Sequence, residues 1–143
     1  MKQRSIISGR IAFKVHDHDG KVVGYIGYKP EDNSWYYPIG FKRPLYNVHR
    51  LKDTKSIVVT VDPFDALRIV SQGITQVTSL LANSMTSEQE DQLTKFKYIL
   101  LLHPEPQNIV NRLYQTSFTK APVLSKPLME LSDQELMNII KPS

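Results

Sequence analysis

The sequence predicts a parallel α/β fold preceded by a small antiparallel β meander. Residues 56–61 form a short, β-branched apolar run, which suits a strand buried on both faces. Residues 64–72 then space their apolar side chains as a helix does, and residues 97–102 repeat the buried-strand pattern. The first fifty residues instead alternate apolar and polar side chains, as half-buried strands do. We therefore expect a β-rich segment at residues 1–52 and an α/β domain at residues 53–143.

The N-terminal segment is expected to contain three strands, at residues 10–15, 21–28 and 34–38. Asp19 and Gly20 lie between the first two strands and both tolerate positive φ, which predicts a hairpin turn. We therefore expect an antiparallel meander, which a polar link connects to the α/β part.

The first helix of the α/β part has recognisable ends. Asp62 stands where an N-cap acceptor belongs, Pro63 suits the first helical position, and Gly73 favours a stop. Ser132 and Glu135 form a capping-box pattern at the start of a closing helix. The remaining predicted elements are strands at residues 75–81 and 97–102, an edge strand at 121–124, and helices at 86–96, 109–114 and 132–140.

Net charge, cysteine content and hydropathy limit the classes of protein to which this chain could belong. The 143 residues carry a net charge of +4 with an isoelectric point near 9.3, which is compatible with a nucleic-acid partner. The chain has no cysteine, which excludes a disulfide framework or a thiolate metal site and favours a reducing cytoplasm. It has no apolar stretch of membrane-spanning length, so we expect a cytoplasmic protein without a membrane partner.

Three ordered segments resemble the Toprim domain of bacterial-type DNA primases. They are residues 58–67 (VVTVDPFDAL), 81–89 (LANSMTSEQ) and 99–105 (ILLLHPE). Residues 8–27 and 46–50 resemble the segment that precedes Toprim in primases, so the resemblance covers most of the chain. It implies a Toprim-like (Rossmann-like) parallel sheet flanked by helices, with the functional site at the carboxyl ends of the strands.

The resemblance is interrupted at the acidic residues on which the family's activity depends. Val61 occupies the position of the catalytic glutamate, and His103 and Glu105 occupy the two aspartate positions of the D-x-D motif. In the family these carboxylates hold magnesium, a cation that prefers oxygen ligands. Because two of the three acids are replaced, the sequence favours a protein without catalysis, and we expect no cofactor.

A rearranged metal site stays open as an alternative. His103 with Glu105 suits zinc or manganese better than magnesium, and Asp62 or Asp65 could supply a shifted acid. Both aspartates also have structural interpretations, since Asp62 is placed to cap a helix and Asp65 to complement its dipole. The run from His16 to Asp19 is interpreted as a solvated turn rather than a metal cluster.

Basic and aromatic residues gather between the second predicted strand and the polar link. Aromatic rings stack on unpaired bases while lysine and arginine contact phosphates, a combination that holds single strands. In the resembled family this region helps to form the template cleft. The opposing interpretation is that Trp35, Tyr37 and Phe41 only cover the sheet. The candidate nucleic-acid-binding residues are Lys29, Trp35, Tyr36, Lys42, Arg43, His49 and Arg50.

The sequence thus predicts a primase-like Toprim protein that binds single-stranded DNA without catalysis, in replication or a mobile element. The alternative is a regulatory subunit with a remnant Toprim fold that docks on a replication, mobile-element or defence protein. A divergent nuclease or primase is a third hypothesis, in which magnesium or manganese would be required.

Overall fold

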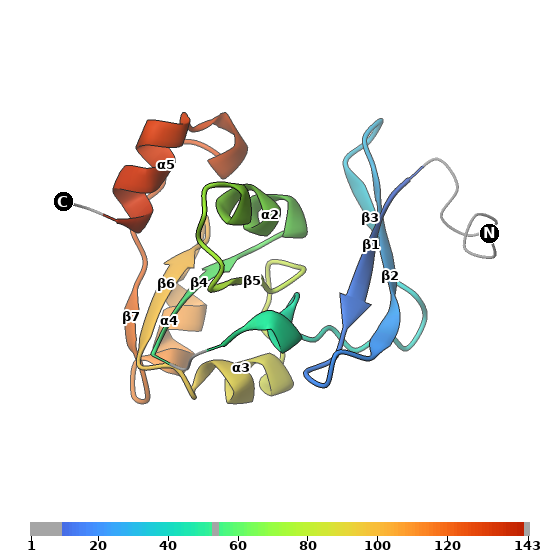
Figure 1. Cartoon of the computed structure of the whole chain (residues 1–143), viewed down its shortest axis with the longest axis horizontal. Helices are drawn as coiled ribbons and strands as arrows, with labels where there is room; N and C mark the ends of the chain where they lie inside the picture. The colour runs from blue at the N-terminus through green and yellow to red at the C-terminus, as the bar shows by residue number, and fades with distance from the viewer. Residues whose placement is uncertain (1–9, 53–54, 142–143) are drawn as a thin grey trace.

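Two sheets lie side by side in the computed structural model, one antiparallel and one parallel (Figure 1). The structure describes residues 10–52 and 55–141. Residues 8–9 of the resemblance and residues 53–54, where the predicted domain boundary falls, lie outside the described residues.

The antiparallel sheet, here called the N-terminal sheet, has the order β1 (Ile11–His16), β2 (Val22–Lys29), β3 (Ser34–Tyr36). Asp17 shapes the turn between β1 and β2, because its Oδ1 accepts hydrogen bonds from the backbone N–H groups of Asp19 (2.9 Å) and Lys21 (3.0 Å). Gly20 adopts the positive φ of +86° that the turn requires, whereas Asp19 does not take a positive φ. The predicted meander and hairpin are therefore present.

The parallel sheet carries the rest of the fold. Its strand order is β5 (Val77–Ser79), β4 (Ser56–Thr60), β6 (Tyr98–Leu102), β7 (Phe118–Lys120). The helices are α2 (Pro63–Ser71), α3 (Ser87–Leu93), α4 (Gln107–Leu113) and α5 (Asp133–Ile140), with short 3₁₀ turns η1 (Val48–Arg50) and η2 (Leu128–Glu130). Helices α2 and α5 share one cluster of buried side chains, and α3 and α4 share another, so helices cover both faces. The predicted α/β class is confirmed.

The predicted helix ends are present as well. Asp62 caps α2, because its Oδ1 accepts a hydrogen bond from the backbone N–H of Asp65 at 3.0 Å, and Pro63 is the first helical residue. Gly73 follows α2 with a φ of +94°. Ser132 forms the expected capping box at the start of α5.

The predicted edge strand at residues 121–124 is wrong. The edge strand is β7, because the backbone N–H of Phe118 already donates to the carbonyl O of Lys97 at 2.7 Å. Pro122 has no N–H to extend a ladder, so the chain leaves the sheet before the expected strand begins. Other predicted elements are present, several with shorter spans.

A single buried amide joins the two sheets. The side chain of Gln89 on α3 is fully buried, and its Oε1 accepts a hydrogen bond from the backbone N–H of Thr86 at 2.9 Å. Its Nε2 donates to the carbonyl oxygens of Leu80 (2.9 Å) and Pro44 (3.1 Å). Leu80 follows β5, whereas Pro44 belongs to the segment that leaves the N-terminal sheet. The amide therefore satisfies its own polar atoms and two carbonyls at the junction.

Further contacts fix the same junction. The backbone N–H of Tyr46 donates to the carbonyl O of Ser79 (3.0 Å), and the Thr78 hydroxyl donates to the carbonyl O of Tyr46 (2.8 Å). The Tyr37 hydroxyl donates to the carbonyl O of Leu81, a buried residue with a φ of +64°.

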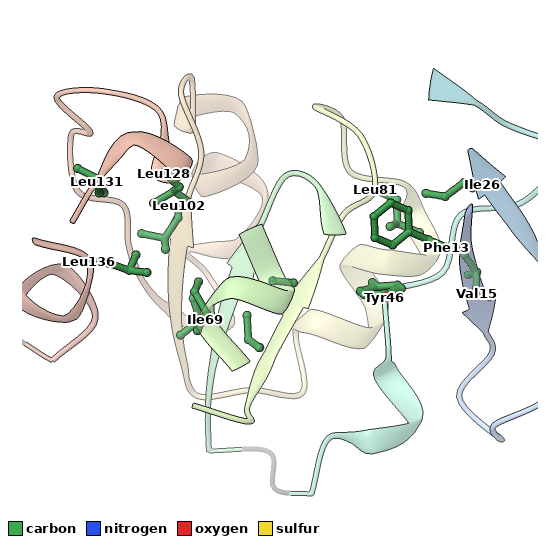
Figure 2. Packing of buried hydrophobic residues seen from close by; sticks show 13 residues of the cluster. Phe13, Val15, Ile26, Tyr46, Ile69, Leu81, Leu102, Leu128, Leu131 and Leu136 are labelled. Atoms are coloured by element: carbon green, nitrogen blue, oxygen red, sulfur yellow. The ribbon is translucent and has the colours of Figure 1, made fainter. Parts of the chain in front are cut away.

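One apolar cluster continues across the junction. In Figure 2, Phe13 and Ile26 of the N-terminal sheet lie beside Leu81 and Tyr46, and the same cluster extends to Leu136 on α5. The predicted division into residues 1–52 and 53–143 therefore separates two sheets that share a core.

We predict that Gln89→Leu lowers the free energy of unfolding by about 2 kcal/mol, because the leucine leaves the part-buried carbonyl of Pro44 and N–H of Thr86 without the partners that the amide supplies. Urea denaturation followed by circular dichroism measures this loss. Gln134→Leu is the matched control, since Gln134 is exposed on α5, and its effect should stay within about 0.5 kcal/mol. Equal effects of the two substitutions would contradict the role given to Gln89.

Candidate functional site

The carboxyl ends of β4 and β6 meet beside a cavity. Thr60 pairs with Leu102 at the last register position of the two strands, so Val61 and His103 follow on neighbouring strands. A cavity of about 420 Å³ opens at this edge of the sheet, here called the strand-end cavity. Its lining residues are Val61, Asp62, Asp65, Leu102, Pro104, Leu124, Lys126, Pro127 and Leu128. The structure thus brings Val61, Asp62 and Asp65 to one place, whereas His103 and Glu105 do not line it.

Both ring nitrogens of His103 form hydrogen bonds with backbone groups. Its side chain is only 5% exposed, and its Nδ1 accepts a hydrogen bond from the backbone N–H of Glu105 at 2.9 Å. Its Nε2 lies 2.7 Å from the carbonyl O of Asn83 and, with Nδ1 acting as acceptor, carries the proton that this bond needs. Both ring nitrogens are therefore occupied, so the imidazole connects the loop after β5 to the end of β6.

The residues at the three acid positions do not fit magnesium. Val61 has no donor atom, both nitrogens of His103 are in use, and Glu105 is exposed. Within residues 10–52 and 55–141, no group of three or more histidine, cysteine or acidic side chains could hold a metal ion. An octahedral cation that prefers oxygen ligands has no sufficient ligand set at these positions.

Two aspartates give the strand-end cavity its electrostatic character. Burial raises the pKa of Asp62, although hydrogen bonds from the backbone N–H groups of Asp65 and Phe64 oppose the rise. Burial and the neighbouring Asp62 carboxylate raise the pKa of Asp65 to about 7, while Arg68 acts in the opposite direction. The capping bond occupies Oδ1 of Asp62, which confirms the predicted capping role.

Arg68 holds the C-terminal wall of the strand-end cavity against α2. Its guanidinium donates to the carbonyl oxygens of Leu128 and Leu131 and lies 3.2 Å from a carboxylate oxygen of Asp133. Since Leu128 lines the cavity, the wall is fixed to the same helix that carries Asp65. No local sequence pattern indicates these contacts of Arg68.

The candidate nucleic-acid-binding residues divide between several locations. Trp35 lies on the inner face of the N-terminal sheet, with its ring 5.9 Å from that of Phe13 and 6.0 Å from that of Phe64. Tyr37 and Phe41 are also half-buried against the core. These rings pack between the two sheets, which favours the covering interpretation for them.

The outer face of the N-terminal sheet carries a different set of side chains. Strand alternation and the pairing of Tyr28 with Trp35 put Lys29 and Tyr36 on the face opposite to Trp35. Lys14 pairs with Tyr25 on that same outer face. Sequence reasoning missed Lys14 and Tyr25, although the period-two alternation of β1 and β2 could have indicated them.

The other basic candidates lie outside this face. Lys42 is exposed, whereas the Arg43 guanidinium donates to the carbonyl oxygens of Leu80 (3.3 Å) and Ser84 (3.0 Å). Arg43 is therefore structural as well as basic.

The last two candidates are on η1. Arg50 is exposed, and the ring of His49 lies 4.3 Å from that of His16. Burial, followed by the neighbouring His16, lowers the pKa of His49. In the turn that follows His16, the exposed His18 lies 3.4 Å from a carboxylate oxygen of Asp19, in agreement with a solvated turn.

We predict that Asp65→Asn makes the chain more stable than the parent at pH 8 but not at pH 4. The pKa of Asp65 is raised from 3.8 to about 7, so the unfolded chain releases this proton first and the parent loses stability as pH rises between those values. After discounting for partial exposure, the gain between pH 4 and 8 should be about 1–2 kcal/mol.

Urea denaturation across this pH range measures the difference, with the exposed Asp91→Asn as the control. A stability difference between the Asp65→Asn variant and the parent that does not change with pH would contradict the raised pKa.

The sequence matches no protein-family model, and no curated protein sequence matches it significantly. Solved structures of DNA primases nevertheless share its fold. The zinc-binding and RNA polymerase domains of Aquifex aeolicus primase superimpose with a TM-score of 0.78 at 21% identity, covering 94% of this chain and 40% of that one.

Two other primases are similar. For the primase fragment of the bacteriophage T7 primase-helicase, the TM-score is 0.70 at 19% identity, over 90% of this chain and 61% of that chain. For the DnaG primase catalytic domain bound to single-stranded DNA, it is 0.66 at 15% identity, over 89% and 48%. This protein therefore has the Toprim-containing fold of DNA primase catalytic domains, as the sequence motifs predicted.

Proposed function

We propose that this chain is a single-stranded nucleic-acid-binding module that retains the primase fold without primase catalysis. The observation that carries the proposal is the combination of this fold with strand ends that present Val61 and a fully hydrogen-bonded His103. A similar DnaG catalytic domain is bound to single-stranded DNA, which supports the same class of ligand for this chain.

The binding surface in this proposal is basic and aromatic. Lys29 and Tyr36 contribute from the outer face of the N-terminal sheet, together with Lys14 and Tyr25. The exposed Lys42, in the segment that follows β3, adds a further positive charge. Lysines neutralise phosphates while tyrosines offer ring faces to unstacked bases, so binding should depend little on base sequence.

The proposal assigns no metal and no cofactor to the module. Catalysis in the family would need carboxylates at Val61 and His103, and neither side chain can supply one. A nuclease with a shifted site would depend on Asp62 or Asp65, but Asp62 already caps α2 and the pKa of Asp65 favours its neutral form below about pH 7.

In this proposal the protein acts in the cytoplasm. Its process is replication or the maintenance of a mobile element. The absence of cysteine fits a reducing compartment. Among the described residues, no helix has the length and apolar character needed to cross a bilayer.

We predict that the chain binds a labelled oligothymidylate with micromolar affinity and that binding weakens steeply with salt, because phosphate contacts release counterions. The double substitution Lys14→Glu/Lys42→Glu should weaken binding by about tenfold, since both residues are exposed, belong to the proposed surface and reverse their charge. Fluorescence anisotropy at low and physiological salt measures both effects. Arg43 is left intact because its substitution would also disturb the loop after β5.

Lys95→Glu/Lys97→Glu is the charge-matched control, because these two exposed lysines lie between α3 and β6, at the opposite end of the parallel sheet. It should bind the oligonucleotide within about twofold of the parent. A complete lack of binding at low salt would overturn the proposal, as would equal losses in the control and the double variant.

We also predict that magnesium and manganese affect oligonucleotide affinity only through charge screening, by the same factor as a monovalent salt of equal ionic strength. A template-directed primer-synthesis assay should give no product above background with either cation. Nucleotide incorporation that requires a divalent cation and is lost in Glu105→Ala would overturn the non-catalytic assignment.

A further inference from the structure

A second concave surface lies at the opposite end of the parallel sheet. A groove of about 350 Å³ runs beside the first residues of β4, β6 and β7 and the last turn of α5; we call it the α5 groove. Its aliphatic floor includes Val58, Ile74, Leu100, Ile139 and Ile140. The strand-end cavity lies instead beyond the last residues of β4 and β6, so the two sites share no residue.

The rim of the α5 groove exposes two aromatic side chains. Tyr98 is 53% exposed and Phe118 is 68% exposed, although they pair directly in the register of β6 and β7. Their ring centroids lie 6.2 Å apart with a tilt of 54°. Two neighbouring aromatic residues beside an aliphatic floor form an apolar patch of the kind that partners cover.

The charge of the α5 groove has one sign. Lys120 and Lys141 line it, and no aspartate or glutamate is among its lining residues. Lys120 lies two residues after Phe118 on β7 and therefore projects from the same face of the strand. A ligand that covers the apolar floor would thus meet two ammonium groups without a competing carboxylate from the lining.

The edge of the sheet beside the α5 groove is open. In the described residues no strand pairs with the outer side of β7, whereas Tyr46 binds the backbone of Ser79 on β5, at the other edge. Phe118 donates its N–H to Lys97, so the backbone groups of Thr119 point to the outer side. An extended segment could add there as a short strand.

We propose that the α5 groove docks an extended acidic segment of a partner protein, with apolar side chains on the groove floor and carboxylates at Lys120 and Lys141. A peptide fits better than a nucleic acid for two reasons. The floor is largely aliphatic and suits branched side chains, and the tilt between Tyr98 and Phe118 prevents the rings from stacking two successive bases in parallel. This inference is independent of oligonucleotide binding by the N-terminal sheet.

The test uses a fluorescein-labelled octapeptide in which glutamate alternates with valine and phenylalanine. Two probes of equal length accompany it, a peptide with lysine in place of glutamate and an oligothymidylate. Anisotropy should show that the acidic peptide binds. NMR of the labelled protein should then place its binding at this groove, with amide chemical-shift changes that centre on residues 98–100 and 118–120. Lys120→Glu/Lys141→Glu should weaken binding by about tenfold, because two favourable charge contacts become repulsive.

Phe118→Ser should weaken binding by about fivefold through lost apolar contact, and its high exposure leaves the fold intact. Lys21→Glu/Lys95→Glu, at two exposed lysines outside the groove, is the charge-matched control and should bind the acidic peptide like the parent. Three outcomes would overturn the proposal: no binding of the acidic peptide, equal binding of the lysine peptide, or oligothymidylate shifting the same amides. Oligonucleotide binding elsewhere would leave it intact.

Discussion

The buried side-chain amide of Gln89 is the interaction on which the arrangement of the two sheets depends. A fully buried amide is costly unless each polar atom has a partner, and here Thr86 and Leu80 of the loop after β5 and Pro44 of the segment after the N-terminal sheet supply them. Because the partners come from the loop after β5 and from the segment that leaves the N-terminal sheet, the amide links these two parts of the chain. The Gln89 contacts therefore help to place the N-terminal sheet, with its basic outer face, relative to the parallel sheet.

Backbone hydrogen bonding also explains the character of the strand ends. In a parallel sheet with helices on both faces, ligand chemistry concentrates where the strands end. In this chain the ends of β4 and β6 carry a valine and an imidazole bonded to two backbone groups. His103 therefore stabilises the loop after β5, a structural use of the position that the primase resemblance assigns to a metal ligand. The carboxylates that line the cavity belong instead to Asp62, the N-cap of α2, and to Asp65 in its first turn.

Local patterns predicted most of the fold, and long-range contacts account for what they missed. The Asp62-Pro63 cap and the Ser132-Glu135 box are encoded within a few residues, so the sequence was sufficient for them. Trp35 was ambiguous, because an aromatic residue on a strand has the same local pattern whether it faces Phe64 or solvent. The contacts of Arg68 with Leu128 and Leu131 join residues about sixty positions apart, and no local pattern indicates them.

Leu81 shows how strongly the junction is determined. A left-handed backbone costs a leucine on the order of 1 kcal/mol, and it persists where the surroundings prescribe it. Its N–H binds the Ser79 hydroxyl at 2.9 Å, its carbonyl binds Tyr37, and its side chain is buried in the shared core. The Tyr37 hydrogen bond and the shared core therefore link this loop conformation to the docking of the N-terminal sheet. As a consequence, the two sheets should lose their structure in one cooperative transition, and neither should behave as an autonomous folding unit.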